Sequence, residues 1–142
     1  MGTPLYQGDS IKKLLLQREP ILMVDTLYSA TEDEATSGLT IKADNIFCVD
    51  GELTEPGLIE HIAQSASAFA SYKATIEGNN EALLGYIGEV KKFVITGKLP
   101  RSGQEIRTKV KIQQVVGNIT LFQAQSEIDG EPIANCQMKL SV

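Results

Sequence analysis

The amino-acid sequence predicts an α+β fold in which one antiparallel sheet wraps around a long central helix. A segment of about 22 residues in the middle of the chain has helical periodicity and small side chains on most of its faces. The segments before and after it alternate apolar and polar residues, which is typical of strands. Their order is two strands, the helix and four further antiparallel strands. The length of 142 residues favours a single domain, which we expect over residues 1–142.

The chain before the central helix predicts a short helix, two strands and a loop. Ser10 is a residue type that often caps helices, and Pro20 ends the helical segment that follows it. An aliphatic segment with Thr and Tyr, and then an alternating segment after a polar turn, are typical of two strands. We expect a helix over 10–17, strands over 21–30 and 35–43, and from 44 to 55 a loop that could hold a short apolar element at 46–49.

The central helix is predicted to begin at Pro56, a residue type favoured in the first turn, and to stop at Gly78. One stripe of its residues is apolar at helical spacing, and a second stripe at the same spacing is polar. Because Ala and Ser are frequent along this segment, we expect other elements to approach the helix on most faces. The apolar stripe is Ile59, Ile62, Ala63, Ala66, Phe69 and Ala70, and the polar stripe is Glu60, Gln64, Ser67, Ser71 and Thr75.

Four strands are predicted after the helix. The first spans 83–96, and the second spans 105–113 with a clean alternation of apolar and polar residues. Gly117-Asn118 marks the next turn, and Asp129-Gly130 is a strong signal for a two-residue hairpin. One face of the second strand holds Ile106, Thr108, Val110 and Ile112, and one face of the last strand holds Ala134, Cys136, Met138 and Leu140.

Composition and charge exclude several classes of function. With 13 Lys and Arg against 18 Asp and Glu, the net charge of −5 argues against nucleic-acid binding. No stretch approaches the roughly 20 apolar residues that span a bilayer, and no leader segment is visible, so we expect a soluble cytoplasmic protein. Cys48 and Cys136 lack the spacing of a metal pair, and His61 is the only histidine. We therefore expect buried thiols, no metal and no redox cofactor.

Five segments carry a resemblance to a known family: Lys13–Asp25, Glu55–Gln64, Gly88–Phe93, Leu99–Gln104 and Asp129-Gly130. In order and spacing they resemble the (3R)-hydroxyacyl-acyl-carrier-protein dehydratases of type II fatty acid synthesis. The first matches the leucine-rich opening with Arg-x-Pro and Val-Asp, and the second matches Pro-Gly followed by Glu-x-x-Ala-Gln on the central helix. The others match the Lys-Phe strand, the Pro-Gly-Asp turn and the last hairpin. The resemblance covers nearly the whole chain and implies the hotdog fold.

The resemblance also assigns candidate site residues. In these dehydratases a histidine in the loop before the helix removes the α-proton, and a Glu or Asp on the helix handles the departing hydroxyl. The loop here, residues 47–57, contains no histidine, and two residues separate Gly57 from Glu60 where the family has four. Glu60 takes the helix position, and Gly57 matches the residue whose amide binds the thioester oxygen. His61 is the one imidazole that could serve beside Glu60, across a dimer interface, and Gln64 lies one turn further on.

The chemistry leaves both a functional and a structural interpretation open. Removal of a proton next to a thioester carbonyl needs a base that titrates near the working pH, which a neutral imidazole supplies. A carboxylate serves as that base only where burial makes it harder to ionise. Glu60 also fits an ordinary first-turn acidic residue, which the helix dipole favours. His61 points about 100° away from Glu60 on the helix and also fits a packed structural histidine.

We therefore expect reversible dehydration of 3-hydroxyacyl thioesters to trans-2-enoyl thioesters, with Glu60 and His61 as catalytic residues and Gly57 and Gln64 binding substrate. The acyl group would be carried by an acyl-carrier protein or by coenzyme A. A homodimer or a higher even oligomer is expected because one sheet alone leaves an edge strand and part of the helix uncovered. Two alternatives stay open: a non-catalytic acyl-thioester-binding or partner subunit, and a hotdog thioesterase.

Two charged sets also allow two interpretations. Asp50, Glu52 and Glu55 fit a solvated acidic loop. The basic residues of the strand half fit either a solvated sheet face or a dock for an acidic carrier protein. They are Lys91, Lys92, Lys98, Arg101, Arg107, Lys109 and Lys111.

Overall fold

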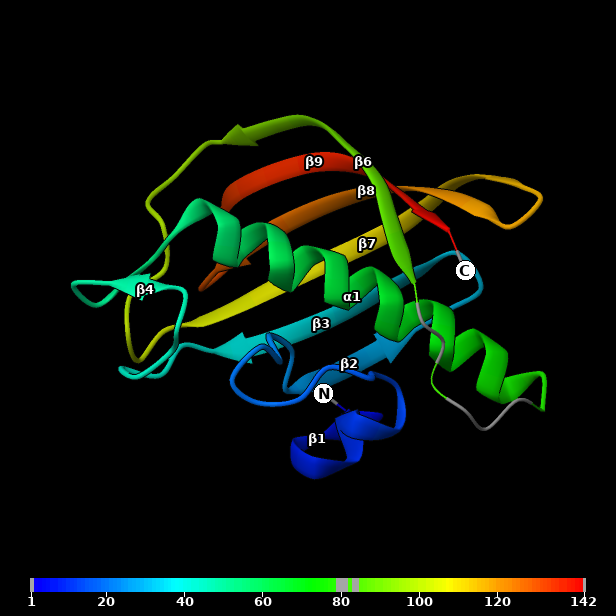
Figure 1. The fold of residues 1–142 in the computed structure, drawn as a ribbon, viewed down its shortest axis with the longest axis horizontal. Helices are drawn as coiled ribbons and strands as arrows, with labels where there is room; N and C mark the ends of the chain where they lie inside the picture. The colour runs from blue at the N-terminus through cyan, green and yellow to red at the C-terminus, as the bar shows by residue number, and fades with distance from the viewer. Residues whose placement is uncertain (1, 79–81, 83–84, 142) are drawn as a thin grey trace.

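One curved antiparallel sheet wraps around a long helix in the computed structural model, which describes residues 2–78, 82 and 85–141 (Figure 1). Within these residues the sheet has seven strands in the order β1-β2-β3-β7-β8-β9-β6. In that order they span Tyr6–Gln7, Thr26–Ala30, Glu34–Thr40, Glu105–Val116, Ile119–Ile128, Glu131–Ser141 and Tyr86–Ile95. The α+β architecture predicted from the sequence is confirmed.

The helix α1 spans Glu55–Ile76, which is 22 residues. It begins with Pro56 in the first turn and ends before Gly78, as predicted. The helix lies across the sheet and packs mainly on β3 and β7 (Figure 1). Ile62 and Phe69 of the apolar stripe are fully buried, and so are Gln64 and Ser71 of the polar stripe. No helix among the described residues is long and apolar enough to cross a membrane.

The alternation predicted for the strands after the helix is confirmed. Ile106, Thr108 and Val110 of β7 are buried under the helix, and so are the four predicted residues of β9, Ala134, Cys136, Met138 and Leu140. The predicted hairpin joins β8 to β9, where Asp129 and Gly130 have φ angles of 52° and 81°. These left-handed conformations are the ones that a two-residue turn of this type requires. The predicted strand over 83–96 is β6 from Tyr86 to Ile95, and residues 83–84 lie outside the described part of the chain.

The pairing of β3 with β7 joins the two halves of the chain. These strands lie on either side of α1 in the sequence and run antiparallel in one continuous register, with Ala35 opposite Val110 and Leu39 opposite Ile106. The pairing places the helix between two stretches of chain that belong to one sheet. It therefore closes a single apolar core around α1.

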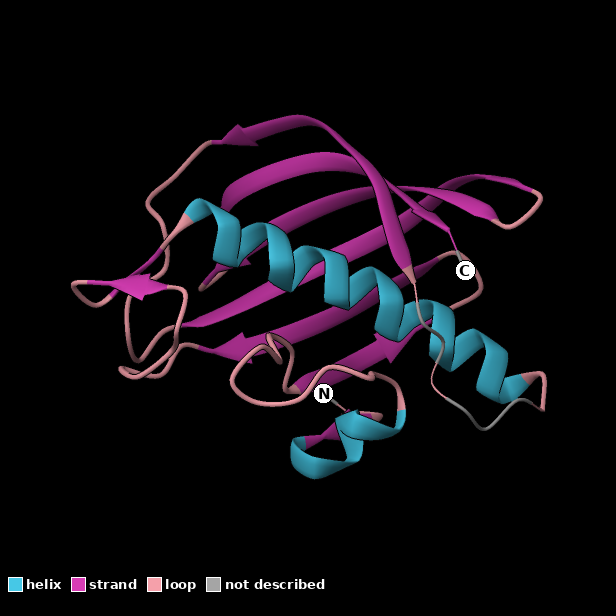
Figure 2. Ribbon diagram, viewed as in Figure 1, coloured by secondary structure: helices cyan, strands magenta, loops and turns pink. Residues whose placement is uncertain are grey.

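Two predictions before α1 are corrected. The helix expected over 10–17 is the 3₁₀ helix η1, Gly8–Lys13, which ends at Leu14. The strand expected over 21–30 begins only at Thr26. Residues 21–25 form a loop beside α1 instead (Figure 2), because side chains of α1 take up the backbone groups of Ile21 and Met23 that a sheet partner would otherwise bind. Hydrophobic composition alone does not reveal that competition.

The loop before α1 holds a small hairpin. The strands β4, Cys48–Val49, and β5, Glu52–Leu53, pair with each other, so the apolar element expected at 46–49 is in part a short strand. Both cysteines are free thiols. Cys136 is buried, and its burial raises the pKa of the thiol to about 11, so this thiol stays protonated and unreactive at neutral pH.

Candidate functional site

Glu60 lies in the second turn of α1 and is half-buried. One turn further along, the Gln64 Nε2 atom donates a hydrogen bond of 2.7 Å to Glu60 Oε2. The predicted spacing of four residues therefore brings the two side chains into direct contact. Gln64 thus holds the Glu60 carboxylate in place, and Glu60 remains partly exposed to solvent.

The Gln64 amide is fixed by backbone groups of the loop before β2. Its Oε1 atom accepts a 2.6 Å hydrogen bond from the Met23 backbone N–H, and its Nε2 donates at 2.9 Å to the Ile21 carbonyl. Only 1% of the Gln64 surface is exposed. The amide thus uses both N–H groups, one on Ile21 and one on Glu60. A substrate-binding role for Gln64 stays a prediction.

His61 is fully buried, and both ring nitrogens have partners. Nδ1 lies 2.7 Å from the Met23 carbonyl oxygen, and Nε2 lies 2.9 Å from Thr108 Oγ1. A carbonyl only accepts, so Nδ1 carries the proton and Nε2 accepts from the Thr108 hydroxyl. Burial lowers the pKa of His61 below its usual value, since charging the ring there removes an ion from water. This is the geometry of a packed neutral histidine, and the catalytic role expected for it stays untested.

Gly57 lies in the first turn of α1 and is buried against the preceding loop. A Cβ atom at this position would lie 2.5 Å from Phe47 Cβ and 2.7 Å from Leu53 Cδ1, closer than real Cβ atoms approach. Glycine therefore lets the loop pack directly on the helix start. The first amides of a helix have no intrahelical acceptor, so an N–H at this end can donate to an external oxygen.

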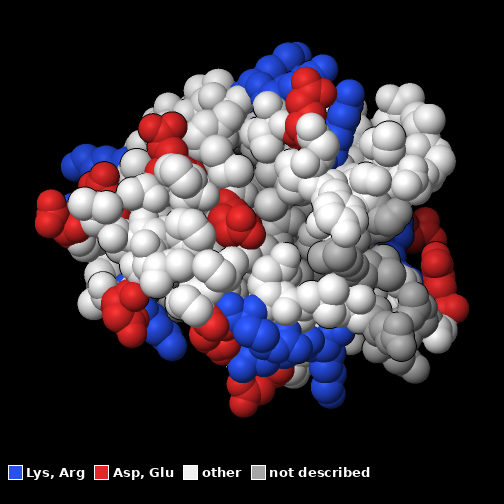
Figure 3. Space-filling view, in the orientation of Figure 1, with Lys and Arg blue, Asp and Glu red and all other residues white. Residues whose placement is uncertain are grey.

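The charged sets found in the sequence lie mainly at the surface. Within the described residues, Arg101 pairs with Glu52 of the acidic loop at 3.3 Å, and Arg107 pairs with Glu105 at 3.0 Å. Lys109 and Lys111 are exposed on the face of β7 that points away from α1. The side of the molecule that bears α1 is mostly uncharged, and Lys and Arg gather at its edges (Figure 3).

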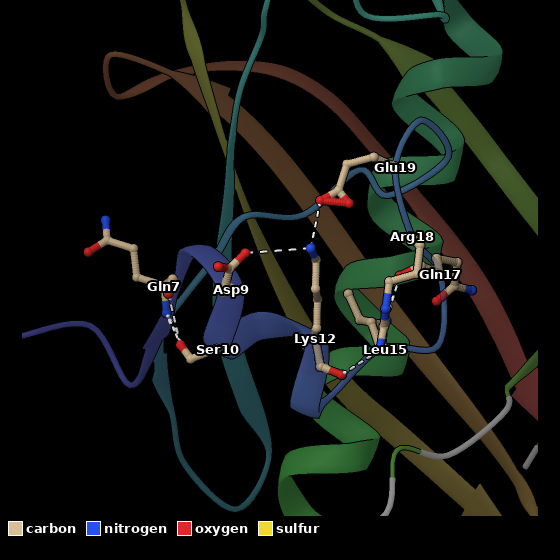
Figure 4. Close-up of polar contacts among 8 residues, drawn as sticks. All are labelled: Gln7, Asp9, Ser10, Lys12, Leu15, Gln17, Arg18 and Glu19. Carbon is tan, nitrogen blue, oxygen red and sulfur yellow. Dashed lines mark hydrogen bonds and ion pairs between the residues drawn. The ribbon is translucent and has the colours of Figure 1, made fainter.

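A cavity of about 360 Å³ lies beside η1, and Glu60 is not among its lining residues. Its rim includes Lys12, which contacts Glu19 at 2.9 Å and Asp9 at 3.5 Å (Figure 4). Leu22 and Val24 form part of its apolar wall. The cavity therefore lies apart from the predicted site at Glu60.

Comparison with known proteins agrees with this arrangement. The model of the ApeP-like family, described as ApeP dehydratase, matches residues 9–142. The 3-hydroxyacyl-[acyl-carrier-protein] dehydratase FabZ of Halorhodospira halophila is 26% identical over 94% of this chain and 90% of its own length. FabZ of Streptococcus sanguinis is also 26% identical, over 94% of this chain and 96% of its own length.

Solved structures confirm the hotdog fold. The dehydratase heterocomplex ApeI:P from Xenorhabdus doucetiae contains a chain that superposes with a TM-score of 0.85 at 12% identity, covering 99% of this chain and 91% of that one. An HP0420 homologue from Helicobacter felis superposes with a TM-score of 0.70 at 15% identity, covering 94% of this chain and 88% of that one. The structural match thus covers nearly the whole chain, and so does the match to the family model. The chain therefore belongs to the family of ApeP-like dehydratases.

Proposed function

We propose that this protein catalyses the reversible dehydration of 3-hydroxyacyl thioesters to trans-2-enoyl thioesters, with Glu60 as the acid/base group. The dehydratase family and the curated relatives, named for the same reaction on acyl-carrier-protein substrates, support the reaction class. The observation that carries the proposal is the half-buried Glu60 carboxylate, held by Gln64 near the start of α1. We also propose that it works in the cytoplasm, where such thioesters are made.

The reaction needs one proton to leave and one to arrive. A base takes a proton from the carbon next to the thioester carbonyl. The electron pair of the broken C–H bond forms the new double bond. The C–O bond to the hydroxyl breaks, and an acid protonates this hydroxyl so that it departs as water. Charge builds up on the thioester oxygen, where the backbone N–H of Gly57 at the helix start would stabilise it.

Glu60 can perform both proton transfers. If it takes the α-proton and gives it to the hydroxyl, the carboxylate ends each cycle as it began. This requires the proton and the hydroxyl to lie on the same face of the substrate, within reach of one side chain. We propose this scheme because His61 has both nitrogens occupied and residues 47–57 contain no histidine.

The partner is proposed to be a second hotdog chain, in the simplest case a copy of this one. β6 is a ten-residue edge strand of the sheet, and Tyr86 and Val94 on it are 62% and 47% exposed. A long edge strand presents a row of N–H and C=O groups with which a strand of another chain can pair. The outward stripe of α1, which includes Glu60, Ala63 and Ala70, is half-buried and small enough for close approach of a partner. A tunnel for the acyl chain would then form between the two chains.

A non-catalytic acyl-thioester-binding subunit is the second candidate function. The observation that favours it is the loop 47–57, which lacks a histidine while the only imidazole is locked in the core. In the ApeI:P heterocomplex a dehydratase chain of this fold is joined to a second chain. A subunit of such a pair could bind or position the acyl group and leave the chemistry to its partner.

One product assay separates these functions. Purified protein is incubated with trans-2-enoyl and 3-hydroxyacyl thioesters of several chain lengths, on both coenzyme A and acyl-carrier protein. We expect interconversion of the two acyl forms with the thioester intact. Release of free thiol would identify a thioesterase instead. No turnover, together with a rise in melting temperature on adding thioester, would establish the binding subunit, since a ligand of the native state stabilises it.

A further inference from the structure

Three backbone groups of the loop before β2 face α1, and two side chains of the helix bind all of them. Gln64 binds the Met23 N–H and the Ile21 carbonyl, and His61 binds the Met23 carbonyl. His61 and Gln64 are three residues apart, so they lie on neighbouring positions of one helix face. The loop is thus clamped to the helix at the level of Glu60.

The clamp fixes the orientation of the Gln64 amide. A backbone N–H only donates and a backbone carbonyl only accepts, so Met23 selects the Oε1 atom of Gln64 and Ile21 selects its Nε2 atom. The reversed amide would place donor against donor at Met23 and acceptor against acceptor at Ile21 and Glu60. Three hydrogen bonds would be lost in a buried place, where unpaired polar groups are costly.

We propose that residues 21–23 act as a backbone template that selects the reacting oxygen of Glu60, with Gln64 and His61 as positioning residues. Because Gln64 Nε2 always presents a donor to Glu60 Oε2, that oxygen stays an acceptor. The proton exchanged with the substrate is carried on Oε1. This inference rests on the proposed role of Glu60 and assigns Gln64 to the carboxylate rather than to the substrate.

His61 acts through Met23. The Thr108 hydroxyl donates to His61 Nε2, so the Thr108 oxygen accepts from the Ser126 hydroxyl, 2.7 Å away. A chain of hydrogen bonds therefore runs from the Ser126 hydroxyl through the Thr108 hydroxyl and the His61 imidazole to the Met23 carbonyl. This buried chain spans β8, β7 and α1 and ties the template to the sheet. A shift of Met23 would move the atom that orients Gln64 and thereby Glu60.

Two substitutions of His61 separate positioning from plain packing. Asn places its Nδ2 where His61 has Nδ1, so His61→Asn keeps the donor to Met23 and loses the Thr108 contact. Gln reaches toward the place of Nε2, so His61→Gln keeps the Thr108 contact and loses the donor to Met23. Both variants remove one buried hydrogen bond, and we expect similar losses of thermal stability.

Turnover should differ between the two variants. For His61→Gln and Gln64→Met we expect kcat for enoyl-thioester hydration to fall about 10- to 100-fold with KM nearly unchanged, since a small misplacement of a reacting group is costly. For His61→Asn, which keeps the donor to Met23, we expect a clearly smaller loss of kcat than for His61→Gln. Equal losses of kcat in the two His61 variants would show that the histidine only packs, and would overturn the template.

A second readout does not depend on turnover. In a ¹⁵N–¹H spectrum both side-chain N–H signals of Gln64, assigned by their loss in Gln64→Met, should be shifted by their hydrogen bonds. Glu60→Gln should change the chemical shift of one of these signals, and His61→Gln should change both. His61→Asn should change neither. Unchanged Gln64 signals in His61→Gln would refute the link through Met23. Signals as expected in a wild-type protein that hydrates no thioester would refute the proposed function while leaving the clamp geometry intact.

Discussion

His61 is the residue whose protonation couples most directly to folding. It is buried in its neutral form, and burial lowers its pKa in the folded protein relative to the usual 6.5. The unfolded chain therefore binds this proton more readily than the folded chain does. Stability contributed by neutral His61 is complete above about pH 6.5 and is lost as the pH falls below that value.

The expected loss is about 1 kcal/mol between pH 6.5 and 5.5, because the unfolded chain takes up the proton there and the buried folded histidine resists it. We would measure the free energy of unfolding with urea near neutral pH and about one unit below 6.5, in wild type and in His61→Asn. Because His61 is the only histidine, the wild type should lose that much more than the variant. An equal loss in both proteins would mean that the folded histidine takes up the proton freely.

Gly57 is the second residue whose role can be tested alone. Gly57→Ala places a Cβ atom within 2.5 Å of Phe47, so the loop must move away from the helix start. We expect a loss of about 1–3 kcal/mol in unfolding free energy, which is typical of overpacking. Gly88→Ala is a matched control, since a Cβ there meets nothing within 4 Å. Similar small effects of both changes in thermal unfolding would contradict the tight packing at Gly57.

For single residues, the sequence predicts contacts between positions close together in the chain and misses contacts between positions far apart in it. The four-residue spacing of Glu60 and Gln64 predicts their contact, and the 100° turn to His61 predicts that it faces elsewhere. The partners of His61 could not be predicted, because Met23 and Thr108 are 38 and 47 positions away in the chain. Only the packing of the sheet on the helix brings them together.

Among the elements, β6 and α1 both leave surface that a partner can cover. β6 is an edge strand with exposed Tyr86 and Val94, and the outward stripe of α1 is built of small side chains. The helix α1 was predictable with its full length because its caps and its periodicity are local. The loop at 21–25 was not, because aliphatic residues suit a strand and a buried loop equally well.

Dimerisation through β6 is the prediction at this scale. Light scattering at micromolar concentration should give twice the chain mass of 15.4 kDa, or a multiple of it. Val94→Glu adds a charge to the edge strand and should shift the protein toward the monomer. Val115→Glu is the control, because Val115 is at least as exposed as Val94 but lies at the β7–β8 hairpin. A monomeric wild type would remove both the dimer and any site shared between chains.

For the whole molecule, the pairing of β3 with β7 decides the fold, because it closes the sheet around α1. The α+β layout was predictable from the order of the elements, but their neighbours in the sheet were not, since local patterns carry no information on long-range pairing. Closing the sheet around α1 also packs the helix face that bears His61 and Gln64 against Met23. The fold thus builds a dehydratase-type helix with one positioned carboxylate and no histidine available beside it.

The central claim is that Glu60 transfers the protons of a dehydration, and one comparison tests it most directly. The rate of trans-2-enoyl-thioester hydration is measured for the wild type, for Glu60→Gln and for Glu55→Gln, an exposed residue in the first turn of the same helix. Glu60→Gln keeps the shape of the side chain but cannot carry the proton, so kcat should fall about 10²- to 10⁴-fold while Glu55→Gln stays near the wild type. An active wild type with an equally active Glu60→Gln would contradict the account.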